Sequence, residues 1–262
     1  MREGRASETA RRVAAQRLTF PRPCIPGGRP GDDDRLQADV AAGLEPGVTP
    51  LTNYLRARTA WVDGVLLGAL EEGIDQVVLA GAGYDGRGLR YARAGVRFFE
   101  LDHPETQADK LGRLARLGID TSGVGFAAVD FLTGDLPAAL AGVDHDPGRP
   151  TLSICEGVAE YLPVEVLGSL LGGLSAACPR GSRLAVTLAL VPVTGAGRAS
   201  RARLRAVVAS MGEDLTSEIP REDLAGFLAR SGWVAETAVD PAGRDLTRSD
   251  GNSAFVLARS GL

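Results

Sequence analysis

Three glycines in the segment LAGAGYDGRG are the first feature of this sequence that points to chemistry. Gly81, Gly83 and Gly86 form the pattern G-x-G-x-x-G, and an acid, Asp102, follows 21 residues after Gly81. This arrangement is typical of loops that bind a dinucleotide, although the same glycines also occur in plain strand-to-helix turns. Asp85 lies inside the loop, where it would face the two negative phosphates of a dinucleotide. The pattern therefore indicates a ligand loop and leaves the ligand open.

Acidic side chains close three successive predicted strands, and they favour a different cofactor. Asp102 ends the second strand, Asp130 the third and Glu156 the fourth. One acid at a strand end is usually structural, but the carboxyl ends of parallel strands meet at one edge, where ligands bind. S-adenosylmethionine has no phosphate and carries a sulfonium and an ammonium group, so it suits an acidic edge. We expect Asp102 to accept from the ribose hydroxyls, Asp130 from the adenine amino group and Glu156 from the ammonium.

Arg58 is the candidate partner of the cofactor's carboxylate. In the predicted helix YLRARTAWVDGVLLGALEEG it shares the apolar face, whereas Arg56 lies on another face with Thr59 and Asp63. A buried arginine needs an anion. The alternative is an internal salt bridge, for example with Asp85.

Short apolar strands and amphipathic helices alternate from residue 76 onward. Strands are expected over 76–80, 96–102, 124–131, 151–157, 182–191, 233–239 and 253–259, and helices over 106–118, 164–174, 198–211 and 221–232. Such alternation is typical of an α/β fold with an open, mostly parallel sheet covered by helices on both faces.

The N-terminal part of the chain is expected to cover this sheet. Residues 1–72 are assigned to a helical cap and lid, with a short helix over 7–18, and residues 73–262 to the cofactor-binding part of the same domain. The Pro-, Gly- and Asp-rich segment 21–50 is either an ordered loop or a mobile lid.

Five motifs occur in the order and spacing of a known family. They are RARTAWVDGVLLGAL, QVVLAGAGYDGRGLRY, FFELDHPETQADK, VDF and TLSICEGVAEYLP. Over residues 7–190 the chain resembles the leucine carboxyl methyltransferase-like family, a branch of class I S-adenosylmethionine-dependent methyltransferases that includes bacterial O-methyltransferases of polyketide and other natural-product pathways. At two places it departs from the family pattern. Gly86 stands where many members have threonine, and the segment 21–50 is long, so acceptor specificity does not carry over.

The resemblance implies a class I methyltransferase (Rossmann-like) fold, in which a seven-stranded, mostly parallel sheet has an antiparallel last strand and a helical cap lies over the cofactor. It implies that S-adenosyl-L-methionine is bound by the positions matching the family's motifs. These are Arg58, the loop Gly81, Ala82 and Gly83, the acid Asp102 with its neighbour His103, the pair Asp130 and Phe131, and Glu156.

Several side chains have roles that the sequence leaves open. His103 can contact the cofactor or cap the following helix, and the cap is the commoner role of a lone histidine. Tyr161 can line the acceptor pocket or pack beneath the next helix. Neither His103 nor His145 is placed as a general base, so we expect a carboxylate or an acidic hydroxyl as acceptor and predict no catalytic side chain. The arginines of 198–205 are expected on a solvated helix face.

Composition excludes several other classes of protein. The net charge of the 262 residues is −4, which gives no reason to expect nucleic acid or an anionic membrane as partner. Three cysteines without metal-ligand spacing argue against a metal site and fit a cytoplasmic protein. The sequence thus predicts a cytoplasmic O-methyltransferase of a small molecule, with no prediction of its oligomeric state. The alternatives are an NAD(P)-dependent oxidoreductase and a cofactor-binding protein without activity.

Overall fold

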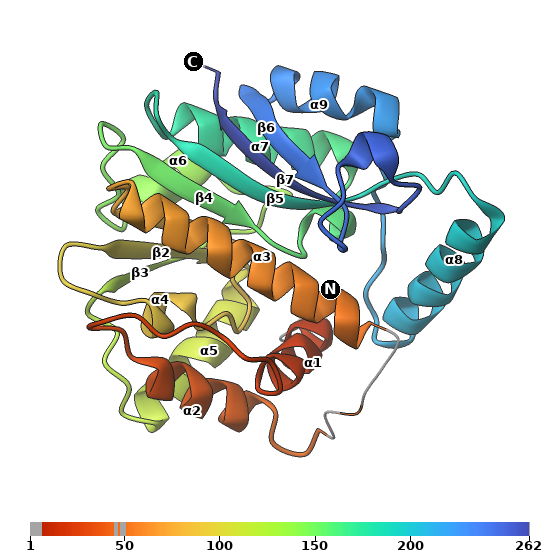
Figure 1. Cartoon of the computed structure of the whole chain (residues 1–262). Coiled ribbons are helices and arrows are strands. Elements are labelled where there is room, and N and C mark those ends of the chain that lie inside the picture. Colours follow the sequence, from red (N-terminus) through yellow and green to blue (C-terminus); the bar gives the residue numbers. More distant parts are fainter. Residues whose placement is uncertain (1–6, 45–46, 48–50, 262) are drawn as a thin grey trace.

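A seven-stranded sheet forms the centre of the computed structural model, which describes residues 7–44, 47 and 51–261 (Figure 1). The strand order is β3-β2-β1-β4-β5-β7-β6. Strands β1 to β5 pair in parallel, and β7 runs antiparallel to both of its neighbours. The strands are β1 (Gln76–Ala80), β2 (Arg97–Asp102), β3 (Val124–Ala128), β4 (Thr151–Cys155), β5 (Arg183–Ala189), β6 (Trp233–Val239) and β7 (Ser253–Ser260). The predicted class I sheet, with its antiparallel last strand, is confirmed.

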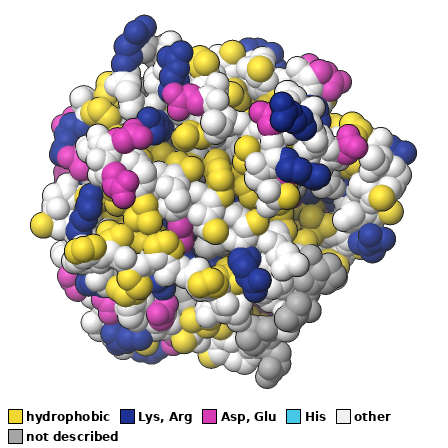
Figure 2. Space-filling model, in the orientation of Figure 1, with side chains coloured by type: hydrophobic (Ala, Val, Ile, Leu, Met, Phe, Trp, Pro, Cys, Tyr) yellow, Lys and Arg dark blue, Asp and Glu magenta, His cyan; other side chains and the backbone are white. Residues whose placement is uncertain are grey.

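Helices cover both faces of the sheet, as the alternating pattern predicts. Helices α6 (Leu136–Ala141), α7 (Val164–Ala176) and α9 (Leu224–Arg230) share one buried apolar cluster with the sheet. The opposite face is covered by α3 (Thr52–Glu71) and α4 (Arg87–Arg90), with α1 (Glu8–Arg17), α2 (Pro30–Val40) and α5 (Pro104–Arg116) outside them. On this second face α3 lies in front of the strands and runs roughly along β4 and β5 (Figure 1), and positive and negative side chains are interspersed (Figure 2).

The segment 21–50 was expected to be either an ordered loop or a mobile lid, and it contains a helix that neither expectation included. Helix α2 begins with Pro30 in its first turn, followed by Asp32 and Asp33. Proline at the first helical position and acids in the first turn are standard helix-start signals, so this helix could have been predicted. Residues 45, 46 and 48–50 of the segment, and residues 1–6 of the expected cap, lie outside the described residues.

Helix α8 (Gly195–Ser210) lies beside the sheet rather than on one of its faces (Figure 1). The expectation of a solvated arginine face is wrong at Arg201, which is 6% exposed. Its guanidinium pairs with Glu160 (2.6 Å) and Glu218 (2.7 Å). Arg201 thereby ties α8 to the 3₁₀ helix η1 (Ala159–Tyr161), which borders the candidate site.

The strand order reverses direction between β1 and β4, which defines the position of the site. From β1 the chain proceeds outward to β2 and β3, and it then returns to the other side of β1 as β4. In open α/β sheets ligands bind beyond the carboxyl ends of the strands at such a point. The described part of the chain contains no helix long and apolar enough to cross a membrane.

Candidate functional site

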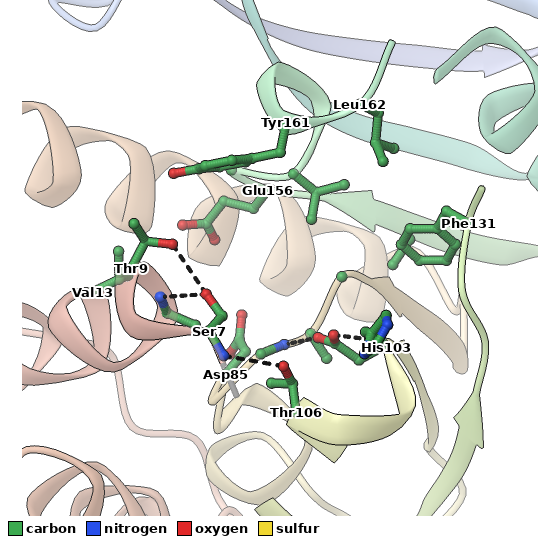
Figure 3. Close-up of a pocket in the computed structure, with 18 of the residues that line it drawn as sticks. Ser7, Thr9, Val13, Asp85, His103, Thr106, Phe131, Glu156, Tyr161 and Leu162 are labelled. Atoms are coloured by element: carbon green, nitrogen blue, oxygen red, sulfur yellow. Dashed lines mark hydrogen bonds between the residues drawn. The ribbon is translucent and has the colours of Figure 1, made fainter. Parts of the chain in front are cut away.

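A cavity of about 650 Å³ lies at the carboxyl ends of β1, β2 and β4, beneath α1 (Figure 3). Every residue that the sequence proposes for cofactor or acceptor binding lines it. They are Arg58, Gly81, Ala82, Gly83, Asp102, His103, Asp130, Phe131, Glu156 and Tyr161. Elements far apart in the sequence therefore meet at one edge of the sheet, and the volume lies within the range of about 300–1,000 Å³ typical of small-molecule sites.

The glycine loop leaves β1 in a conformation that only glycine adopts easily. Gly81 and Gly83 have φ of +72° and +52°. A Cβ on Gly81 would also lie 1.9 Å from a methyl carbon of Val158, so a side chain has no room there. The N–H groups of Gly81 and Ala82 donate to Leu101 O at 2.8 and 3.2 Å, which fixes the loop against β2.

The third glycine of the pattern has a different function from the first two. Gly86 has no positive φ, but a Cβ there would lie 1.8 Å from Oδ1 of Asp33 in α2. The two places where the sequence departs from the family pattern thus touch each other. Gly86 makes room for the helix of the long segment, so the dinucleotide-like spacing is a consequence of packing.

Asp85 does not present the bare negative charge that the sequence indicated. It is 5% exposed, and its carboxylate pairs with Arg87 (2.5 Å) and Arg17 (3.4 Å). Its Oδ1 also accepts from the backbone N–H of Arg87 at 2.9 Å. A phosphate would need free N–H groups at a helix N-terminus. The Asp85 carboxylate already accepts from the N–H of Arg87 at the start of α4, a helix of only four residues. A pyrophosphate is therefore disfavoured because this N–H is occupied, and not because of the charge of Asp85.

Asp102 is held in place by the loop that it faces. Its two carboxylate oxygens accept from the backbone N–H groups of Gly83 and of His103. A carboxylate offers about four acceptor positions, so both oxygens can still receive another donor. His103 caps α5 by accepting from Glu105 N at 3.3 Å, as expected of a structural histidine, and its side chain also borders the cavity.

Asp130 and Phe131 line the wall of the cavity next to His103. Strand β3 ends at Ala128, so both residues lie just after the strand instead of within it. The Asp130 carboxylate accepts from Leu132 N at 2.9 Å, which fixes the turn. Figure 3 shows the Phe131 ring on the same side of the cavity as His103, opposite α1.

Glu156 is surrounded by cations at the opposite end of the cavity. Its oxygens pair with Arg58 (2.8 Å), Arg17 (3.1 Å) and Arg87 (2.5 Å). Burial would raise the pKa of Glu156, but Arg87, Arg17 and Arg58 hold it well below its usual value. Arg58 therefore has an internal ion pair, as the alternative proposed, but its partner is Glu156 and not Asp85.

The faces of α3 are only partly as expected. Arg58 is 5% exposed and Arg56 is exposed, which confirms that they lie on different faces. Thr59 and Asp63, however, are also buried, and Asp63 pairs with Arg22 and Arg87. Helix α3 is thus buried on two sides, because Arg22 of the segment before α2 and Arg87 of α4 cover the side that the sequence assigned to solvent.

Several lining residues have no counterpart in the sequence analysis. They are Ser7, Thr9, Val13 and Arg17 of α1 and its cap, and Glu213, Asp214 and Thr216 after α8. The hydroxyls of Ser7 and Thr9 donate to Glu213 at 2.9 and 2.6 Å. Spacing along the chain gave no signal for this pairing, because it joins residues about two hundred positions apart. Arg17 could have been suspected from its place on the inner side of the predicted first helix.

Tyr161 borders the cavity on the side of α1, whereas His145 lies elsewhere. Figure 3 shows the Tyr161 hydroxyl directed toward Thr9. Burial and the nearby Glu160 raise the pKa of Tyr161, so its phenol is protonated at neutral pH. His145 is buried, its Nε2 lies 3.1 Å from Oγ1 of Thr151 at the start of β4, and burial lowers its pKa. In the described part of the chain, no cluster of His, Cys, Asp or Glu could hold a metal ion.

Comparison with known proteins agrees with this geometry. The model of the leucine carboxyl methyltransferase family matches residues 15–175. The chain belongs to this family. One relative, named as an S-adenosyl-L-methionine-dependent methyltransferase of Frankia alni, is 36% identical over 239 residues, which is 89% of this chain and 80% of the relative. A similarly named protein of Mycolicibacterium smegmatis is 34% identical over 85% of this chain and 78% of its own length.

Solved structures show the same fold at lower identity. A methyltransferase structure from Thermobifida fusca covers 100% of this chain and 97% of its own, with a TM-score of 0.61 and 20% identity. The magnesium protoporphyrin IX methyltransferase of Synechocystis, solved with bound S-adenosylhomocysteine, covers 82% and 90%, with a TM-score of 0.53 and 17% identity. The chain is thus a class I, S-adenosylmethionine-dependent methyltransferase, and the alternative of an NAD(P)-dependent oxidoreductase is set aside.

Proposed function

We propose that this enzyme methylates an oxygen atom of a small-molecule acceptor, either a carboxylate or an acidic hydroxyl of the kind found in polyketides and other secondary metabolites. The observation that carries the proposal is the division of one cavity into two chemically different parts. Ionised groups gather at the strand ends. The remaining wall presents Val13, Tyr161 and Leu162 together with the carboxylates of Glu213 and Asp214, and it carries no histidine.

The strand-end part fits S-adenosylmethionine group by group. Asp102 has acceptor capacity left for the ribose hydroxyls, and Asp130 with Phe131 forms a wall suited to adenine. Glu156 is placed for the ammonium of the methionyl part, and Arg58 with Arg17 for its carboxylate. When bound, S-adenosylmethionine supplies an electrophilic methyl group on a sulfonium. We assign these roles to the residues because each has the matching charge and lies on the same cavity.

The second part of the cavity fits an acceptor that needs no strong base. His145 is buried at the start of β4, away from the cavity, and Nδ1 of His103 is used in capping α5, so we assign neither histidine as a general base. Tyr161 is protonated and can donate a hydrogen bond to an acceptor oxygen. The chain then contributes mainly by aligning that oxygen with the methyl group, and such alignment can provide most of the rate enhancement.

A labelled-methyl experiment tests this proposal. The purified enzyme is incubated with S-adenosylmethionine carrying a ¹³C methyl group and with a panel of carboxylic acids, phenols and alcohols. Mass spectrometry should show one labelled methyl group on an acceptor oxygen. Mild alkali then separates a methyl ester, which releases labelled methanol, from an ether, which does not. Asp102→Ala serves as the control that should form no product at low cofactor concentration. Transfer exclusively to nitrogen, carbon or sulfur would refute O-methylation.

A further inference from the structure

Helix α1 spans the cavity and is tied to different elements along its length. At its N-terminal end, Ser7 N donates to Thr106 Oγ1 of α5 at 3.3 Å, beside the wall that carries Asp102. At its C-terminal end, Arg17 pairs with Glu156. Between these ties the side chains of Thr9, Ala10 and Val13 line the cavity. Helix α1 therefore forms a roof over the proposed cofactor site, and that roof needs a fixed position.

Glu213 is the residue that fixes the first turn of this roof. Its carboxylate accepts from Ser7 Oγ at 2.9 Å, from Thr9 Oγ1 at 2.6 Å and from Thr9 N at 3.4 Å. Both oxygens of Glu213 are used, and the residue is 7% exposed. No arginine, lysine or histidine in the described ranges forms an ion pair with it, so its charge is compensated only by neutral donors of α1. Burying a carboxylate without a cation is costly. A role beyond general stability is therefore needed to account for it.

The segment that carries Glu213 is itself firmly attached. Thr216 N donates to Glu160 O at 2.8 Å, and Ser217 Oγ donates to Ala159 O at 2.7 Å. Both acceptors belong to η1, which also presents Tyr161 to the cavity. Glu213 thus links the helix that covers the proposed cofactor site to a segment fixed on η1, the element that carries Tyr161.

We propose that Glu213 is a positioning residue for cofactor binding, because it holds the first turn of α1 closed over the cavity and thereby slows the dissociation of the bound nucleoside. The inference rests on the cofactor placement in the proposed function, but not on the identity of the acceptor. The bonds from Ser7 and Thr9 must break before α1 can move away, so their loss should act on the dissociation rate. Glu213, Ser7 and Thr9 need not touch the reacting atoms to have this effect.

S-adenosylhomocysteine is the probe for this inference, since it needs no acceptor. Its dissociation rate is measured by chasing the bound, labelled compound with an excess of unlabelled compound. Glu213→Ala should dissociate about tenfold faster or more, because three hydrogen bonds to a carboxylate are lost. Glu213→Gln keeps a side-chain oxygen as acceptor and should stay within about threefold of the wild-type enzyme. The matched control is Glu218→Ala, which removes a carboxylate from the same segment but not from the cavity wall, and it should leave the rate unchanged.

A mutant cycle separates positioning from a general loss of stability. The variant Thr9→Val removes a hydroxyl donor of Glu213 and leaves the cap bond from Ala10 N to Ser7 Oγ intact, and combining it with Glu213→Ala should add no more than about twofold, because the same contact is already lost. An unchanged rate in Glu213→Ala, an equal increase in Glu218→Ala, or additive effects in the cycle would overturn the inference while the proposed function survives. A wild-type enzyme that does not bind S-adenosylhomocysteine would overturn both.

Discussion

The two ends of the cavity are held together by different physical means. At the end that carries Glu156, three arginines pair with this buried carboxylate. Further ion pairs extend from Arg87 to Asp63 and from Asp63 to Arg22. At the roof, Glu213 has only hydroxyl and backbone donors. Removing one partner of a buried ion pair is strongly destabilising, whereas the loss of a hydrogen bond from a neutral donor costs less. The difference indicates a rigid floor around Glu156, to which Arg17 ties the C-terminal end of α1, and a more weakly held first turn of the roof.

The largest expected effect is that of Glu156→Gln. Removing this charge leaves the buried Arg58 without its ion-pair partner and leaves Arg17 and Arg87 with fewer carboxylates, so the free energy of unfolding should fall by about 3–5 kcal/mol. Urea unfolding followed by circular dichroism measures it, with the exposed Glu165→Gln as control, which should change by less than about 0.5 kcal/mol. A loss no larger than that of Glu213→Gln would show that floor and roof do not differ as the ion pairs indicate.

The same pair of proteins gives a pH test with a defined sign. The pKa of Glu156 is lowered in the folded state, so its stabilising contribution is present above the unfolded carboxyl value of about 4.3 and is lost as pH falls through the folded value. The stabilities of the wild-type enzyme and Glu156→Gln should therefore differ most at neutral pH and approach each other below about pH 4. Divergence toward acid pH would contradict the assignment.

A smaller effect is expected from Arg58→Ala, and here the target is cofactor binding. Affinity for S-adenosylhomocysteine should fall by about 1.5–3 kcal/mol, the range for hydrogen bonds to charged groups, since Arg58 both faces the cavity and orients Glu156. Arg56→Ala, on the exposed face of the same helix, should bind within about twofold of the wild type by calorimetry. Equal losses in both variants would remove the argument from helix faces. Unfolding of Arg58→Ala alone would mean that the pair with Glu156 is purely structural.

This contrast also shows how far the sequence could lead. Local patterns identified the strands, the glycine loop and the acids at the strand ends, because each depends on residues that are close in sequence or on the common edge of parallel strands. The burial of Arg58 was predictable from helical spacing alone. The burial of Asp63 was not, since it depends on Arg22 and Arg87, which reach α3 from other segments of the folded chain.

The roof lay beyond the sequence for a related physical reason. Ser7 and Glu213 come together only through the folded arrangement of α1 and the segment after α8, and neither residue belongs to a motif. The sequence offered Arg58 as a possible partner of Asp85, and its pairing with Arg17 was missed because Arg17 comes from that same roof helix. Contacts between distant segments are decided by tertiary packing, which a single sequence does not display.

Asp102→Ala tests the strand-end part of the cavity outside the ion-pair network. The affinity for S-adenosylhomocysteine should fall by about 1–3 kcal/mol, because a half-buried acceptor proposed for the ribose hydroxyls, which also accepts from two backbone N–H groups, is lost. The fold should survive, since the residue closes a strand and does not pack within the core. Calorimetric titration measures the affinity and thermal unfolding the fold, with the exposed Asp120→Ala as control. Unaltered binding would show that the ribose is held elsewhere.

The smallest effect is expected where the two histidines are replaced together. In His103→Asn, His145→Gln, asparagine can still cap α5 and glutamine can still bond Thr151, so the fold should tolerate both changes. If the acceptor is a carboxylate, it is already ionised at neutral pH and needs no base. The maximal rate should then stay within about threefold of the wild type, below the factor of about 100 that general-base catalysis contributes, and remain nearly flat from about pH 6 to 9.

Steady-state rates across that pH range, measured with the acceptor from the labelling experiment, check this expectation. A loss of about a hundredfold or more in the maximal rate, with the affinity for S-adenosylhomocysteine intact, would instead assign a histidine base and a phenolic or alcoholic acceptor. The single variants then distinguish the two residues. His103 borders the cavity and could act directly, whereas His145 lies at the opposite end of β4 and could act only through the fold. A rate loss confined to His103→Asn would therefore identify His103, on the cavity wall beside Asp102, as the general base.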